Sequence, residues 1–311
     1  GKTVTTELGH RHPGPTVNPH NYKHTPGGSS SGSAAAVADL MIPISFGTQT
    51  TGSVIRPAAY CGVVGYKPTY GDFDKSGILP NSPSNDTLGL MARSIDDIAL
   101  MRSILIEEKV HLDNNINLKN LTFAFIKSPY WNDMEEESKK KLEEFFNTLV
   151  KNKFKISEVD LNDLIIKSSE IHTKISGYEF RRSISPERFH HLEKLSDILR
   201  NGRLNVGNNM KLNDYHNLLD ELNKFREILQ NNLSQYDCII TPSAMGEALK
   251  GIEYTGSAQL NTTWTLLGYP SITLPLFKSK NNLPIGCQFI SKKANDDLLL
   301  SISKKIIQEL F

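Results

Sequence analysis

The chain has 311 residues, and its 35 basic and 34 acidic side chains leave a net charge of +1. This near balance gives no electrostatic basis for binding nucleic acid or an anionic membrane surface. Hydrophobic residues make up 38% of the sequence, enough for a large core, but no run of about 18 apolar residues could span a bilayer. We therefore expect a globular protein that binds neither nucleic acid nor membranes.

Cysteine and histidine usage argues against disulfides and bound metal. The cysteines form no Cys-x-x-Cys pair, which is typical of buried thiols in a reducing compartment, so we expect a cytoplasmic protein. They are Cys61, Cys238 and Cys287. Four histidines lie near the N-terminus in a Pro-, Gly- and Asn-rich loop without a carboxylate or cysteine at ligand spacing. These are His10, His12, His20 and His24. We expect no metal and no cofactor.

Residues 26–71 place two serines on glycine-rich turns. Two glycines precede Ser29 and one precedes Ser53, and glycine permits the tight backbone turn that presents a hydroxyl. Gly/Ser-rich stretches are often flexible linkers or phosphate loops, but these flanks are apolar and no Gly-Lys-Ser/Thr sequence follows. Ser53 also lacks the Gly-x-Ser-x-Gly pattern of an α/β-hydrolase elbow. The pattern favours a pair of catalytic loops.

The elements around the two serines are readable from their residue types. Small residues at 34–38 predict a closely packed helix whose N-terminal N–H groups face the first serine loop. Apolar residues at 42–46 predict a strand that runs into a loop at 47–53. Successive N–H groups of that loop could hold a developing oxyanion. A strand, a glycine turn and a serine together indicate a nucleophile.

The rest of the chain alternates strand-like and helical patterns. The order strand, helix, strand at 121–126, 135–152 and 155–161 predicts a crossover unit on a sheet. Residues 162–233 are polar and helical without a clean boundary, so we interpret them as a helical excursion within one domain spanning 1–311. Further strands and a closing helix are predicted near the C-terminus, at 238–241, 271–274, 287–290 and 296–311. The fold class is α/β, with helices on both faces of the sheet.

The order of residues in these segments resembles the amidase signature family. GGSSSGS at 27–33 and TQTTGSVIRPAAYCGVVGYKPTYG at 48–71 are similar to its signature region. LGLMARSIDDIAL at 88–100 is similar to the segment that follows, and NTTWTLLGYPSITLPL at 261–276 to a closing part. The resemblance covers nearly the whole chain and is weakest in the middle. It implies a large mixed, twisted sheet with helices on both faces.

The resemblance also implies a Ser-Ser-Lys hydrolase acting on a small linear amide without a cofactor. Ser53 would attack the carbonyl and form an acyl ester, and Ser29 would relay the proton to a neutral lysine. The backbone N–H groups of Thr50, Thr51, Gly52 and Ser53 would form the oxyanion hole. Substrate-binding residues are unknown at this point, and homodimer formation is left open.

One part of the family pattern does not occur in this sequence. In the family the lysine lies in a Gly-x-Lys-Asp motif upstream of the segment that corresponds to GKTVTTEL, with which this chain begins. We therefore expect the chain to lack the triad lysine and the N-terminal portion of the domain. Lys2 and Lys67 belong to other positions, and we interpret both as surface lysines.

Other interpretations stay open beside that of an amidase. One is the amide-hydrolysing component of a glutamyl-tRNA amidotransferase, although Gln49-Thr50-Thr51 differs from the Asp-Thr-Gly typical of such proteins. Another is a non-catalytic remnant that lacks the base. Arg56 is expected to order the serine loop, whereas the basic group at 181–188 is a solvated helix face or a contact for a substrate carboxylate.

Overall fold

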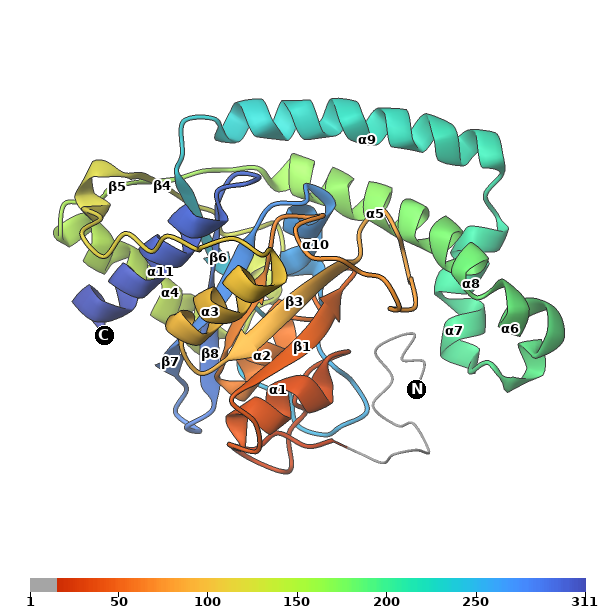
Figure 1. The fold of residues 1–311 in the computed structure, drawn as a ribbon, viewed down its shortest axis with the longest axis horizontal. Helices are drawn as coiled ribbons and strands as arrows, with labels where there is room; N and C mark the ends of the chain where they lie inside the picture. Colours follow the sequence, from red (N-terminus) through yellow and green to blue (C-terminus); the bar gives the residue numbers. More distant parts are fainter. Residues whose placement is uncertain (1–15) are drawn as a thin grey trace.

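The computed structural model describes residues 16–311, and its centre is a mixed sheet of eight strands (Figure 1). The strand order is β1-β3-β2-β7-β8-β6-β4-β5. β4 runs parallel to β5 and β6, and the other neighbours pair antiparallel. The strands are β1 Ile44–Gln49, β2 Val64–Lys67, β3 Thr87–Ala92, β4 Thr122–Phe125, β5 Lys155–Glu158, β6 Cys238–Pro242, β7 Ser271–Lys278 and β8 Pro284–Ile290. The predicted α/β class with a mixed sheet is confirmed.

Helices account for most of the remaining structure. The α-helices are α1 Ser31–Ala38, α2 Ile55–Cys61, α3 Ile95–Leu105, α4 Glu136–Lys151, α5 Asn162–Ser183, α6 Ser185–His190, α7 Asp197–Asn201, α8 Arg203–Asn208, α9 Leu212–Leu233, α10 Gln259–Leu266 and α11 Asp296–Leu310. Short 3-10 helices lie at Leu118–Asn120, Trp131–Asp133 and Leu192–Lys194.

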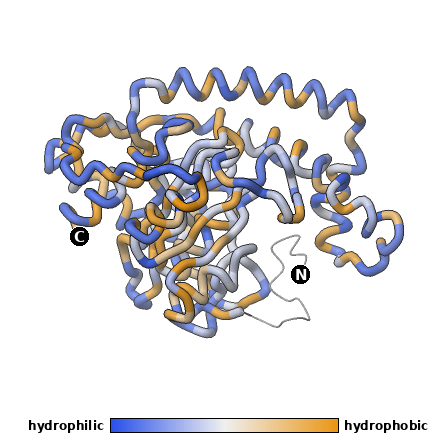
Figure 2. Tube along the Cα trace, in the orientation of Figure 1, coloured by the Kyte–Doolittle hydropathy of each residue, from blue (hydrophilic) through white to orange (hydrophobic). Residues whose placement is uncertain are grey.

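Each face of the sheet has its own apolar layer. Because side chains alternate along a strand, Phe123 and Phe125 of β4 face one side and Ala124 faces the other. The side of Phe123 packs against α3, α4 and α11, and the side of Ala124 packs against α5, α9 and α10. Apolar residues gather along the central strands, whereas α9 alternates polar and apolar positions (Figure 2). Helices therefore cover both faces, as the sequence predicts.

Several predicted elements match the structure, with shifts at their ends. The predicted strand at 42–46 begins at Ile44 and continues to Gln49, so Gly47 and Thr48 belong to the strand rather than the loop. Gly47 has no room for a side chain, because an added Cβ would lie 2.8 Å from Ser30 Oγ. The crossover at 121–161 is present as β4, α4 and parallel β5.

The segment 162–233 builds one end of the molecule. Its long helices α5 and α9 lie side by side along the top in Figure 1, and α6, α7 and α8 project beside them. α8 contacts α5 closely at two glycines, since a Cβ on Gly207 would lie 2.2 Å from the carbonyl oxygen of Gly177. This contact brings α7 and α8 toward the serine loops.

The cysteines and the helix lengths bear on two expectations. Cys61, Cys238 and Cys287 are free thiols and buried, and burial raises the pKa of each. Between residues 16 and 311, no helix is both long and apolar enough to cross a bilayer.

Candidate active site

The first serine loop leads into α1 and leaves one hydroxyl free. Ser31 Oγ donates to the carbonyl of Gly27 at 2.7 Å, and Ser30 Oγ lies 3.5 Å from the carbonyl of Thr48. Ser29, which follows a cis peptide bond, has no hydrogen-bond partner for its hydroxyl within residues 16–311. Of the three consecutive serines, Ser29 is the one available for chemistry.

The second serine loop is held from below by Gln49, the last residue of β1. Gln49 is fully buried, and its Oε1 accepts hydrogen bonds from the N–H groups of Val54 and Ile55 at 2.9 and 3.0 Å. Its Nε2 donates to Thr265 Oγ1 at 3.0 Å, and Thr265 Oγ1 donates to the carbonyl of Thr51 at 2.6 Å. The turn that carries Ser53 is therefore tied to α10 and to the start of α2.

Arg56 connects the two loops. Its Nη2 donates to the carbonyl of Gly28 at 2.5 Å, next to Ser29, while its backbone follows Ser53 in α2. The side chain is buried, and burial lowers the pKa of Arg56 from its usual value, although a guanidinium stays charged in proteins. The expectation that Arg56 orders the glycine-rich loop agrees with this contact.

The backbone N–H groups before Ser53 are unoccupied. In the described part of the chain, the amides of Thr50, Thr51, Gly52 and Ser53 donate to no carbonyl or side chain. A Cβ on Gly52 would lie 2.3 Å from Asn261 Oδ1, so only glycine fits there. Unpaired amides beside a serine are what an oxyanion hole requires.

Both serines line one cavity of about 310 Å³. Thr50 and Thr51 line it as well, and the opposite wall comes from α7, α8 and the segment 254–258. A second cavity of about 340 Å³ shares Ser29, Thr50 and Asn81 with the first and includes Lys75. The structure thus places every sequence-predicted site residue at one location, with Gly52 buried just behind it.

Three buried polar residues that the sequence analysis missed hold Thr50. His172 Nε2 lies 2.8 Å from the Thr50 carbonyl, and since a carbonyl can only accept, the ring carries its proton on Nε2. Thr50 Oγ1 donates to Asp86 Oδ1 at 2.6 Å and accepts from Asn81 Nδ2 at 3.0 Å. The shortest of these separations is 31 residues, so no local sequence signal could have revealed them.

We expect His172 to make folding stability pH-dependent. Burial lowers the pKa of His172 to about 4, and the hydrogen bond to Thr50 opposes this only in part. Unfolded histidine binds a proton near pH 6.5, so stability is complete above about pH 6.5 and falls toward pH 4 by up to about 1.4 kcal/mol per pH unit. In urea unfolding near pH 7 and near pH 5, His172→Gln should lose less stability than the wild type. Equal losses would contradict this, because the carboxylate contributions are common to both proteins.

Lys67 corrects a sequence interpretation. The expected surface lysine is fully buried at the end of β2, where its Nζ donates to the carbonyl of Pro68 at 2.8 Å. Burial lowers the pKa of Lys67 to about 7, against the opposing effect of Asp296 and Asp72. It lines neither serine cavity. Lys2 lies outside the described residues.

The basic group at 181–188 is not where the cavity obtains its charge. Arg181 donates to the carbonyls of Gly207 and Met210, and neither it nor Arg188 lines a serine cavity. The arginine from the helical segment that does reach the 310 Å³ cavity is Arg203. Its Nη1 donates to Asn81 Oδ1 at 2.9 Å.

The histidines near the N-terminus divide between two regions. His20 Nε2 hydrogen-bonds the Cys61 carbonyl at 2.9 Å, and His24 pairs with Lys250 in a β-bridge. His10 and His12 lie outside the described residues. From residue 16 onward there is no group of three His, Cys, Asp or Glu side chains placed to hold a metal ion.

Comparison with known proteins identifies the family. A sequence profile described as Amidase matches residues 3–300. The chain belongs to the Amidase family. The resemblance seen in the sequence is thereby confirmed, and the matched range includes both serine loops and the helical segment 162–233.

Relatives within and around the Amidase family differ in their reactions. The A subunit of glutamyl-tRNA(Gln) amidotransferase from Staphylococcus aureus (strain Mu3 / ATCC 700698) is 29% identical over 330 positions, which cover 93% of this chain and 68% of that protein. The crystal structure of an amidase superimposes with a TM-score of 0.87 at 27% identity and covers 99% of this chain and 72% of its own. The corresponding glutamyl-tRNA(Gln) amidotransferase protein of Thermotoga maritima gives 0.80 at 27% identity, covering 98% and 70%.

Proposed function

We propose that this Amidase family member hydrolyses the carbon–nitrogen bond of a small linear amide through an acyl-enzyme on Ser53. The observation that carries the proposal is the shared cavity of Ser29 and Ser53. Both hydroxyls are free of hydrogen bonds in the described structure, and unpaired amides adjoin Ser53. Serines that serve only packing or turn formation bond to nearby carbonyls, as Ser31 does.

The proposed reaction has two balanced halves. Ser53 Oγ bonds to the carbonyl carbon while its proton passes to Ser29 Oγ and the proton of Ser29 passes to a base. The oxyanion is held by the amides of residues 50–53. As the carbon–nitrogen bond breaks, the proton returns through Ser29 to the leaving nitrogen. Water then attacks the Ser53 ester in the same way and releases the acid.

The direct test is covalent labelling. A fluorophosphonate probe reacts with an activated serine hydroxyl, and we expect the label on the tryptic peptide that contains Ser53. Labelling of Ser29 or of no serine would overturn the assignment. Absence of label together with absence of turnover would favour the alternative of a non-catalytic protein.

The charge of the cavity indicates which amides fit. Its lining contains Arg56 and Arg203 but no carboxylate, and Arg56 is already bound to the first serine loop. Arg203 therefore provides the cavity's available positive charge, and a guanidinium binds a carboxylate through two parallel N–H groups. We propose that the substrate carries a carboxylate in addition to its amide.

Arg203→Met is expected to separate two kinds of substrate. A charged hydrogen bond is worth about 1.5–3 kcal/mol, so kcat/KM for carboxylate-bearing amides should fall by about ten- to a hundredfold. The kcat/KM for uncharged amides should change by less than about threefold. Ammonia release over a panel of paired amides measures both, and equal losses for the two kinds would contradict the proposed contact.

Lys75 is a lysine to test as the base, since it lines the cavity that includes Ser29. Burial lowers its pKa, but its Nζ donates to the carbonyls of Asp86 at 2.7 Å and Pro83 at 3.4 Å and lies 4.5 Å from the ring centre of Tyr70. These contacts all favour a charged, tethered ammonium. We expect Lys75→Met to lower kcat by less than about tenfold, whereas loss of a general base costs about a hundredfold or more. A loss of that size in steady-state assays would identify Lys75 as the base.

A second candidate is the amide-hydrolysing component of a tRNA-dependent amidotransferase, which the Staphylococcus aureus relative represents. Its amide would be glutamine, a carboxylate-bearing amide compatible with Arg203. Ammonia release from glutamine that depends on added partner proteins and charged tRNA would favour this candidate. Turnover of amides by the chain without partners would favour the amidase.

A further inference from the structure

A large cavity on another part of the molecule is lined by cations. Its volume is about 690 Å³, and it lies between α9, the turn that joins α10 to β7, and the loop 292–295. It shares no lining residue with the two serine cavities. Arg226, Lys292 and Lys293 line it, and none of its described lining residues is a carboxylate.

Arg226 is fixed in orientation with part of its guanidinium free. Its Nε and Nη2 both donate to the carbonyl of Leu266, at 3.1 and 2.8 Å. Nη1 has no partner in the part of the chain that the structure describes. Burial lowers the pKa of Arg226, yet a guanidinium remains charged. A rigid, partly desolvated guanidinium is suited to bind an oxyanion.

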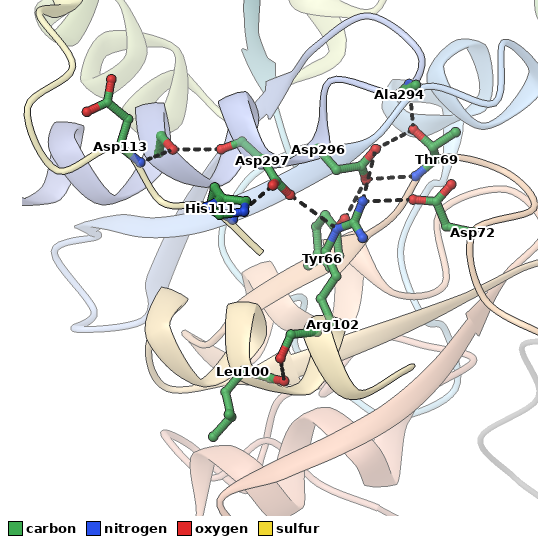
Figure 3. A network of polar contacts seen from close by, with 12 residues as sticks. Tyr66, Thr69, Asp72, Leu100, Arg102, His111, Asp113, Ala294, Asp296 and Asp297 are labelled. Atoms are coloured by element: carbon green, nitrogen blue, oxygen red, sulfur yellow. Dashed lines mark hydrogen bonds and ion pairs between the residues drawn. The ribbon is translucent and has the colours of Figure 1, made fainter. Parts of the chain in front are cut away.

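The loop that carries the two lysines is anchored rather than free (Figure 3). The N–H of Ala294 donates to Thr69 Oγ1 at 2.9 Å, and Asp296 accepts from the N–H of Thr69 at 2.9 Å. Lys292 Nζ donates to the carbonyl of Ser234 at 2.6 Å, which connects the loop to the end of α9. The lysines and Arg226 therefore keep fixed relative positions.

Nearby carboxylates are already neutralised by other partners. Asp72 and Asp296 lie 3.0 and 3.9 Å from Arg102 in the network of Figure 3. Glu179 accepts hydrogen bonds from Ser82, Ser84 and Tyr215. The positive charge of the cavity is thus not cancelled by acids around it.

We propose that this cavity binds a small molecule with a phosphate or polyphosphate group. Three cations fit the two or more negative charges of a phosphate better than the single charge of a carboxylate. Neutral donors complete the lining, among them the amides of Asn223 and Asn295 and the Tyr269 hydroxyl, which has no partner among the described residues. Through Leu266 the cavity adjoins Thr265, whose hydroxyl supports the second serine loop.

Isothermal titration with inorganic phosphate and pyrophosphate tests the proposal on the 311-residue chain. We expect saturable binding of pyrophosphate with a Kd below about 1 mM. Lys292→Met/Lys293→Met should raise that Kd at least about tenfold. Lys278→Met/Lys280→Met removes the same charge from two exposed lysines outside the cavity and should change it less than about twofold.

Each outcome decides the question. An equal loss of affinity in both double variants would show attraction to the net charge only and overturn the site. Binding that does not saturate, or no binding of either anion, would overturn it as well. Thermal unfolding of both variants checks that they are folded, and Arg226→Lys, which keeps the charge but loses the fork, should weaken pyrophosphate binding without abolishing it. Unchanged affinity in Arg226→Lys and in the cavity double variant would place the anion elsewhere.

Discussion

Replacing Ser53 with alanine is expected to abolish both fluorophosphonate labelling and amide turnover. The substitution removes the oxygen that forms the acyl ester, and no other free hydroxyl adjoins the unpaired amides of residues 50–52 in the described structure. Loss of a serine nucleophile lowers kcat by more than about a thousandfold. Gel fluorescence of the labelled protein and ammonia release from the preferred amide measure the two effects.

The stability of Ser53→Ala provides the control. Ser53 makes no side-chain hydrogen bond within residues 16–311, so its thermal unfolding midpoint should stay close to that of the wild type. Labelling that persists in the folded variant would show that the probe reacts at another residue, and the proposed nucleophile would then be wrong.

Ser29→Ala is expected to have the second-largest effect. In the proposed mechanism Ser29 carries the proton between Ser53 and the base, and loss of such a group costs about a hundred- to ten-thousandfold in kcat. Because the nucleophile remains, fluorophosphonate labelling of Ser53 should slow rather than vanish. Steady-state kinetics and the time course of labelling measure the two results.

Ser30→Ala is the matched control, since Ser30 stands next to Ser29 on the same turn. Its hydroxyl contacts the Thr48 carbonyl at 3.5 Å and does not line the cavity. We expect kcat within about threefold of the wild type. If Ser29→Ala and Ser30→Ala lose the same activity, the loss comes from distortion of the loop and not from proton relay.

The glycine-rich turns and the strand that precedes Ser53 were predictable because their causes are local. Gly27 has a φ of 76°, a conformation that glycine adopts without strain, and the sequence alone indicates a turn there. The crossover of β4, α4 and β5 was predictable for the same reason, since its periodicity changes within one short segment. β2 was missed because Val64–Lys67 is four residues long and becomes a strand by pairing with β3 and β7.

The sequence by itself determined the family, the pair of serines and the loop whose amides adjoin Ser53, because residues close in the chain create these features. Only the tertiary structure decided that Lys67 is buried, that His172 and Asp86 hold Thr50, and that Arg203 supplies charge to the cavity. These contacts join segments that are far apart in the chain. Burial and charge depend on which distant elements meet, and that is set when the sheet and its helices pack.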